Sequence, residues 1–302
     1  MLPTACVVAA LMAVSAASSA QVSDPADPVQ LVRTTMTNEI AAANHSTVKF
    51  MFRSRKRTPN GVQNKIYVEA NEALATMTIS DNNGPLTSDR ERAETDQLAS
   101  LVNNPDQLRK KRAHDKQEVE HTLCILKALP DAFRYEYAGS EKSVNGLGKV
   151  GDDLVRLKFT PNPAYTPPTR VEQLLQGMAG YVLIDPRTHR LARIDGTLFK
   201  DVTFGWGIFG RLDKGGHFSV QQADVGDGSW EITAMNLNFN GKILLVKSLS
   251  IVFDEVFSDF QRLPENVPFA QGVELLHSEQ ERLAQDVAVD AENAKAGKKT
   301  LQ

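Results

Sequence analysis

Apolar and polar residues alternate with a period of two in segments that are spread over most of this chain. Phe50 and Phe52 are separated by one residue, and Phe133, Tyr135 and Tyr137 repeat the pattern much further along. Successive side chains of a β-strand point to opposite faces of a sheet, so each segment predicts a strand with one dry and one solvated face. Such strands are typical of antiparallel sheets, around which we expect this chain to build its core.

Residues 180–263 are expected to form a β-meander. Its strands are predicted to turn at Asp185–Thr188, at Asp227-Gly228 and at Asn240-Gly241. The last of these is the type I′ dipeptide that most favours a tight hairpin. The strand that follows, Ile243–Phe257, is too long to stay flat, and we expect it to curl as strands of a barrel or half-barrel do.

Other segments follow the period of an α-helix. Asp27 and Pro28 are typical of a helix start, and apolar residues then recur at steps of three and four up to residue 43. Two helices are predicted within 86–129, where charges are dense and β-branched residues are few. Thr169–Glu172 is a capping box, and residues 264–290 return to helix.

Together these elements predict one α+β domain over residues 21–290, with a helical insertion at 86–129. The expected architecture is a strongly curved antiparallel sheet, an unclosed half-barrel whose concave face is covered by helices. The small, polar residues 291–302 are expected to be a disordered tail.

The first twenty residues indicate export. They contain no charged side chain, and an apolar run ends in the small residues Ser18-Ser19-Ala20. This pattern is typical of a signal peptide cut after Ala20, and the run is too short to span a bilayer. Cys6 precedes the run, so a lipid anchor is not expected. We predict a soluble periplasmic or secreted protein with no transmembrane helix and with Cys124 as its one thiol.

No motif in the sequence predicts a metal, a cofactor or a catalytic group. Residues 205–210 match G-x-G-x-x-G literally, but they lie among antiparallel strands, whereas a dinucleotide site needs a parallel βαβ unit. None of the six histidines lies at metal-ligand spacing from a second His or Cys. The net charge of -3 gives no reason to expect nucleic acid as a partner.

Asp213, His217 and Asp224 leave one catalytic alternative open, because they fall near one glycine-rich segment. An acid/base cluster there would suit a secreted hydrolase. Carboxylates beside turns are more often simple turn formers, so this alternative ranks below the others.

The aromatic and aliphatic positions of the strands are the best candidates for a ligand site. They form either an ordinary filled core or a curved face with room left for an apolar ligand. The candidate cavity residues are Phe50, Phe52, Ile66, Val68, Phe133, Tyr135, Tyr137, Phe159, Tyr181 and Leu183.

The hairpin at 180–194 reads GYVLIDPRTHRLARI, and this pattern resembles the outer-membrane lipoprotein carrier (LolA/LolB-like) superfamily. Much of the chain is also similar to an uncharacterised secreted bacterial branch that has a segment like FGWGIFGRLDKGGHF at 204–218. The resemblance implies an unclosed barrel with a helical lid and an acyl-chain cavity in a protein that is not an enzyme. The carriers' cavity arginine aligns with no Arg here, so no functional residue is transferred.

We therefore expect a non-catalytic exported protein that binds a lipid or acyl chain and carries lipid or lipoprotein across the periplasm. The expected partners are the acyl chain of a lipoprotein, envelope proteins or a membrane surface. The alternative is an envelope interaction or sensor protein with the same fold and a filled core.

Overall fold

The computed structural model describes residues 27–45, 47–82, 84–204, 210–243 and 247–299. The expected signal peptide at 1–20 lies outside these residues. The helices are α1 (Pro28–His45), α2 (Ser88–Asn103), α3 (Pro105–Ala132), α4 (Arg170–Gln173) with the 3-10 turn η1 (Leu174–Gly177), and α5 (Phe269–Lys299). The strands are β1 (Lys49–Thr58), β2 (Gly61–Glu69), β3 (Leu74–Asp81), β4 (Gly84–Pro85), β5 (Phe133–Lys142), β6 (Asp153–Pro161), β7 (Met178–Asp185), β8 (Arg190–Leu198), β9 (Val202–Phe204), β10 (Gly210–Leu212), β11 (His217–Asp224), β12 (Trp230–Ile243) and β13 (Lys247–Leu263).

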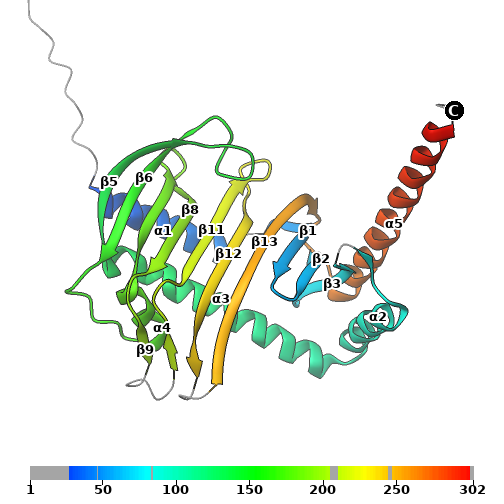
Figure 1. The fold of residues 1–302 in the computed structure, drawn as a ribbon, viewed down its shortest axis with the longest axis horizontal. Helices are drawn as coiled ribbons and strands as arrows, with labels where there is room; N and C mark the ends of the chain where they lie inside the picture. Colours follow the sequence, from blue (N-terminus) through cyan, green and yellow to red (C-terminus); the bar gives the residue numbers. More distant parts are fainter. Residues whose placement is uncertain (1–26, 46, 83, 205–209, 244–246, 300–302) are drawn as a thin grey trace, which may run out of the picture.

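The strands form one open antiparallel sheet, shown in Figure 1. Its order is β4-β3-β2-β1-β13-β12-β11-β8-β7-β6-β5, and β9 and β10 extend from β12 beside this path. Strands β12 and β13 are the longest, at 14 and 17 residues. The prediction of an α+β protein with a curved, unclosed antiparallel sheet is confirmed.

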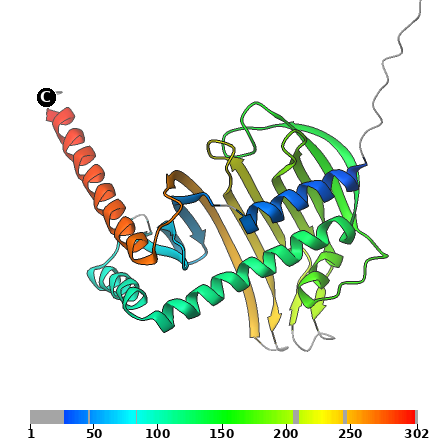
Figure 2. The same cartoon turned by 180° about the vertical axis from the view of Figure 1, so that it is seen from behind.

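Helices α1 and α3 cover one face of the sheet, which we call the α1 face. Both helices cross this face in Figure 2. Val32 and Met36 on α1 are each 1% exposed, and they pack with Leu129 of α3 over Phe159 and Leu157 of β6. The one-sided apolar stripe predicted for the first helix is what seals this half of the sheet.

Helix α5 packs on the opposite face, which we call the α5 face, and covers the other end of the sheet. Its Val273 and Leu276 pack on Ile66, Val68 and other residues of β1–β3. Helices therefore lie on both faces of the sheet, α1 and α3 on one and α5 on the other. The strands under α1 and the strands under α5 present their apolar side chains to opposite faces of the sheet.

The β1–β2 turn decides which side chains share a face. A two-residue loop, Pro59-Asn60, pairs Thr58 with Gly61, and the same register pairs Phe52 with Tyr67 and Arg53 with Ile66. Directly opposed residues of antiparallel strands point to the same side, so Phe52 and Ile66 lie on different faces. The prediction of one shared dry face for these strands is wrong, because a register offset of one residue reverses every side chain.

The expected Asn240-Gly241 turn is not a turn. Strand β12 continues through both residues, and Gly241 pairs with Leu249 of β13. A Cβ added to Gly241 would lie 2.1 Å from the carbonyl oxygen of Arg211, so glycine is required here for the close approach of β10. The β12–β13 connection is at 244–246, outside the described residues.

The helical insertion is α2 and α3, and the break between them is at Asn104. Its side chain accepts hydrogen bonds from the backbone N–H groups of Asp106 and Gln107, as an N-cap does. Residues 291–299 of the expected disordered tail are helical, because they are the last part of α5. Residues 291–299 consist mainly of Ala, Glu and Lys, which are strong helix formers.

Candidate functional site

The structure distributes the ten predicted cavity residues over both faces of the sheet and does not bring them together. Phe133, Tyr135 and Phe159 lie under α1 and α3, where they fill the core. The ring centroids of Phe133 and Phe159 are 4.6 Å apart, and the Tyr135 hydroxyl donates to the Leu129 carbonyl at 2.9 Å. This part of the predicted cavity is therefore a packed interior.

Four more candidates point to the other side of the sheet. Ile66 and Val68 are fully buried beneath α5. Leu183 is buried in a small cluster with Trp230, and Tyr181 packs at its border with the Arg156 guanidinium 4.0 Å from its ring centroid. Tyr137 is not one of these four and is 43% exposed at the edge strand β5.

Phe52 belongs to a different site, and Phe50, which is 4% exposed, borders it with its ring centroid 6.0 Å from that of Phe260. The Phe52 ring stacks on Tyr67 and on Phe260, with centroids 5.0 and 5.3 Å away, and meets Phe257 at 6.0 Å. All four side chains are only half-buried. Together with Phe253, we call this set of rings from β1, β2 and β13 the aromatic patch.

The aromatic patch continues the α1 face beyond its helical cover. Strand register places Phe253 opposite Leu237, and Leu237 opposite Phe218, in a row across three strands. These three side chains are half-buried, whereas Phe159 on the sealed half of the same face is 1% exposed. The face is thus closed over β5–β8 and partly open over β11–β13, β1 and β2.

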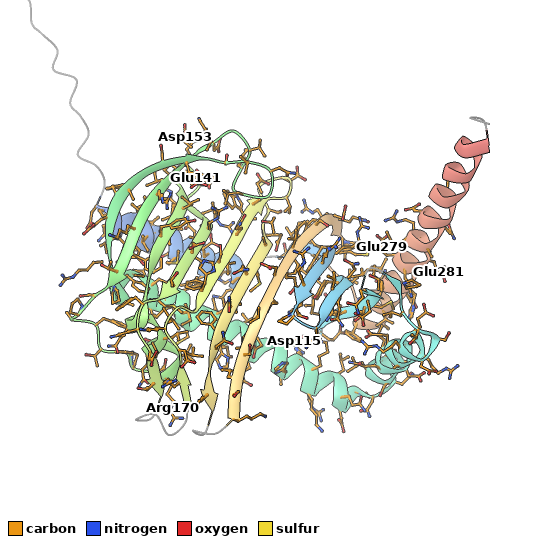
Figure 3. All side chains as sticks on the ribbon, in the orientation of Figure 1. Asp115, Glu141, Asp153, Arg170, Glu279 and Glu281 are labelled. Carbon is orange, nitrogen blue, oxygen red and sulfur yellow. The ribbon has the colours of Figure 1, made fainter. Side chains whose placement is uncertain are left out.

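Helix α3 passes the open half without sealing it. Its contacts with the core under α1 come from its last two turns, such as Ile125 and Leu129. Near its start, Leu108 packs with the α5-face core, and Asp115 accepts a hydrogen bond from the Leu74 N–H at 3.1 Å. Figure 3 labels Asp115 where α3 passes this end of the sheet. Between these attachments, Val119 is 47% exposed.

A buried carboxylate lies at the centre of the aromatic patch. Glu255 is 6% exposed, and its Oε1 accepts hydrogen bonds from Ser54 at 2.8 Å and from Tyr67 at 3.2 Å. Lys56 Nζ lies 3.2 Å from the other oxygen and 3.9 Å from the Phe253 ring centroid. Burial, and then the negative charge of Glu255, raise the pKa of Tyr67 to about 12, so its hydroxyl stays a donor at neutral pH.

A second buried cluster joins α1 to the sheet. Glu39 of α1 accepts two hydrogen bonds from Arg190, at 2.8 and 3.1 Å, and a third from the Leu191 N–H. Burial first, and then the negative charges of Glu69 and Glu39, raise the pKa of nearby Glu231 to about 7 against the opposing charge of Arg190. The cluster therefore combines carboxylates from α1, β2 and β12 with one arginine.

The three residues of the hydrolase alternative do not meet. His217 Nε2 lies 3.3 Å from Asp195, and its Nδ1 lies 3.0 Å from Asn236. Asp224 instead accepts hydrogen bonds from the N–H groups of the turn that follows it. Asp213 forms an ion pair with the neighbouring Arg211 at 2.7 Å.

The described residues contain no group of three His, Cys, Asp or Glu side chains placed to hold a metal ion. Most of the G-x-G-x-x-G segment, 205–209, lies outside the described residues. The strands on either side of it, β9 and β10, pair antiparallel with each other. Within the described part of the chain, no helix has the length and apolar character that crossing a membrane requires.

The sequence contained a usable but irregular indication of the aromatic patch. Phe253 and Phe257 share one strand face with Glu255, and Phe260 follows at an interval of three. That interval breaks the period of two, because β13 has a bulge at Asp259, whose φ is +58°. The bulge returns Phe260 to the side of Phe52, with which it stacks.

The fold and the site define an α+β protein with an open antiparallel sheet and a partly exposed aromatic patch. No family model matches the chain, and no curated protein does. A solved structure of a DUF1329 family protein from Desulfovibrio piger has 12% sequence identity, with 78% of this chain and 93% of that chain covered and a TM-score of 0.25. A similarity this low assigns no function.

Proposed function

We propose that this protein binds an acyl chain against the aromatic patch and acts without catalysis. The supporting observation is the contrast within the α1 face. The rings of Phe52, Tyr67, Phe253 and Phe257 stay partly exposed, while the same face is sealed a few strands away. A group of partly wet aromatic rings suits an unbranched apolar chain, and each methylene taken out of water contributes about 0.8 kcal/mol.

The neighbourhood of Lys56 suits a ligand with an anionic head group. The ammonium of Lys56 lies at the patch, next to the Phe253 ring, with 29% of its side chain exposed. Glu255 lies beside it: its Oε1 accepts from Ser54 and Tyr67, and its Oε2 pairs with Lys56 at 3.2 Å, so a bound head group would share Lys56 with Glu255. In this proposal the bound chain lies along the rings, and the head group lies toward Lys56.

Palmitate binding to purified protein tests the proposal. Phe257→Asp places a charge among the rings and is expected to weaken palmitate binding by about tenfold or more, a loss of at least about 1.4 kcal/mol. Val256→Asp is the matched control, because Val256 is the preceding residue on β13, is 55% exposed and points to the other face. Isothermal titration calorimetry of both variants gives the comparison.

Failure to bind palmitate, or equal loss in both variants, would contradict the proposal. Native mass spectrometry of protein from an exporting host adds the identity of any lipid that co-purifies. The role as an exported carrier of lipid or lipoprotein is part of the same proposal. Recovery from the periplasm with a new N-terminus at Gln21 would support it, and retention of residues 1–20 in the cytoplasm would oppose it.

One observation favours the second candidate, an envelope interaction or sensor protein. The core under α1 and α3 is filled by Phe133, Tyr135, Phe159 and their neighbours. If the protein neither contains nor takes up lipid, the aromatic patch is better explained as a surface for another envelope protein.

A further inference from the structure

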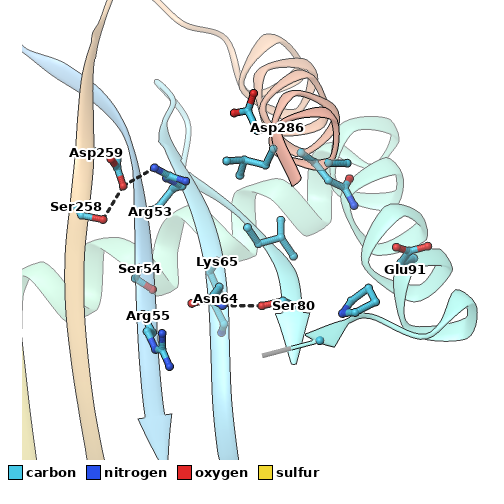
Figure 4. A pocket seen from close by; sticks show the side chains of 16 residues that line it. Arg53, Ser54, Arg55, Asn64, Lys65, Ser80, Glu91, Ser258, Asp259 and Asp286 are labelled. Atoms are coloured by element: carbon cyan, nitrogen blue, oxygen red, sulfur yellow. Dashed lines mark hydrogen bonds and ion pairs between the residues drawn. The ribbon is translucent and has the colours of Figure 1, made fainter. Parts of the chain in front are cut away.

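The α5 face contains a recess of about 800 Å³ that is separate from the aromatic patch. It lies between α5, the start of α2 and the strands β1–β3, as Figure 4 shows, and we call it the α5 groove. Helix α5 packs tightly on the sheet at Val273 and Leu276, but Leu283 two turns later is only half-buried. Figures 1 and 2 show the C-terminal part of the helix extending away from the body. The volume of the α5 groove falls within the range of about 300–1,000 Å³ that is typical of small-molecule sites.

The α5 groove has an apolar side. Ile79 of β3, Pro85 of β4, and Leu283 and Ala284 of α5 line it. Ile79 and Leu283 also pack against the buried core between α5 and the sheet. The apolar lining of the groove is therefore continuous with that core and suits a short alkyl chain.

The strand side of the α5 groove is mainly cationic, with Arg53, Arg55 and Lys65 beside one carboxylate, Asp259. The strand wall contains Arg53, whose guanidinium lies 2.6 Å from Asp259, and the exposed Arg55. The helical wall contains Glu91 of α2 and Asp286 of α5, both exposed. Figure 4 shows the arginines on the strands and these two carboxylates on the helices opposite them.

Internal ion pairs offset part of the charge on each wall. Asp259 on the strand wall also accepts from Ser258 at 2.7 Å, so it is held by Arg53 and Ser258 together. Asp286 pairs with Arg282, four residues earlier on the same helix, at 2.7 Å. A head group with one charge would meet repulsion from one wall, whereas a dipolar head group can face both walls favourably.

We propose that the α5 groove binds a single-chain amphiphile with a zwitterionic head group. The anionic part of the head lies toward Arg55 on the strands, the cationic part lies toward Glu91, and the alkyl chain lies on Ile79, Leu283 and Ala284. The site does not depend on the proposed function. None of the rings of the aromatic patch lines the groove, and the β1–β2 register puts Arg53 and Phe52 on opposite faces, although Ser54 borders both sites.

Dodecylphosphocholine, used below its micelle concentration, is the probe for this site. We expect the full chain to bind it more tightly than dodecyl sulfate or dodecyltrimethylammonium, which have the same alkyl chain and one charge each. Ala284→Trp fills the groove and is expected to weaken binding of dodecylphosphocholine by about tenfold. Gln285→Trp is the matched control, because Gln285 is the next residue on α5 and does not line the groove.

A second variant tests the charge separation. Glu91→Lys makes the helical wall more cationic, so we expect weaker binding of dodecylphosphocholine and stronger binding of dodecyl sulfate. Phe257→Asp on the other face is expected to leave dodecylphosphocholine binding unchanged, which distinguishes the two sites. Equal affinity for all three probes, or equal effects of Ala284→Trp and Gln285→Trp, would overturn the proposal.

Discussion

Glu39→Ala is expected to lower the free energy of unfolding by about 3–5 kcal/mol, because it leaves a buried arginine without its partner. The Glu39 side chain is 6% exposed and that of Arg190 is 16% exposed. Glu39 also accepts the Leu191 N–H at 2.8 Å, so the alanine variant leaves a backbone donor unsatisfied as well. Since this pair joins α1 to β8, the loss should also loosen the helical cover of the α1 face.

Chemical denaturation of a double-mutant cycle measures this effect. Arg190→Ala is expected to be similarly destabilising, because it leaves the carboxylate buried alone. Replacing both residues by methionine removes both charges together and is expected to cost less than either single alanine change. If the single changes each cost under about 1 kcal/mol, the pair behaves as an exposed ion pair and the argument is wrong.

Glu231 is expected to make the protein lose stability as the pH rises toward neutrality. Burial raises its folded-state pKa from 4.5 to about 7, and the negative charges of Glu69 and Glu39 contribute to the shift. A carboxyl group with a raised folded pKa binds its proton more tightly in the folded state. Its contribution is therefore fully present below about pH 4.5 and is lost between that pH and about 7. The shift corresponds to about 3 kcal/mol.

The variant Glu231→Gln isolates this contribution, because other carboxyl groups have opposite effects. The pKa of Glu172, for example, is lowered by its hydrogen bonds from Tyr165, Cys124 and Thr169, which outweigh its burial. The difference in unfolding free energy between Glu231→Gln and the parent should grow in favour of the variant from pH 4.5 to 7.5. Glu274→Gln, at an exposed position of α5, should show no such trend. A flat difference for Glu231→Gln would contradict the raised pKa.

Much of the local structure could be predicted from neighbouring residues. The Asp27-Pro28 start, the break at Asn104-Pro105 and the Thr169–Glu172 capping box all mark helices in the structure. The Thr169 side chain accepts from the Glu172 N–H, as a capping box requires. These patterns succeed because a cap or a strand period depends on residues only a few positions apart.

The candidate site was predicted less well, because its composition depends on strand pairing. Phe52 was among the predicted residues, and it lies in the aromatic patch. Its neighbours there are Tyr67 on β2 and Phe257 and Phe260 on β13, about two hundred residues later in the chain. Of these, Tyr67 alternates with the two predicted core residues Ile66 and Val68, so an assignment by alternation places it on the wrong side.

The sequence by itself determined the class of this protein, an α+β fold around antiparallel strands, because periods of two and of three to four residues are local properties of the chain. The tertiary structure alone decided which face each strand turns to α1 or to α5. It also brought Glu39, Glu69 and Glu231 together from three distant elements and left the aromatic patch partly open. The physical reason is that one residue of register, or one bulge, moves a whole row of side chains across the sheet.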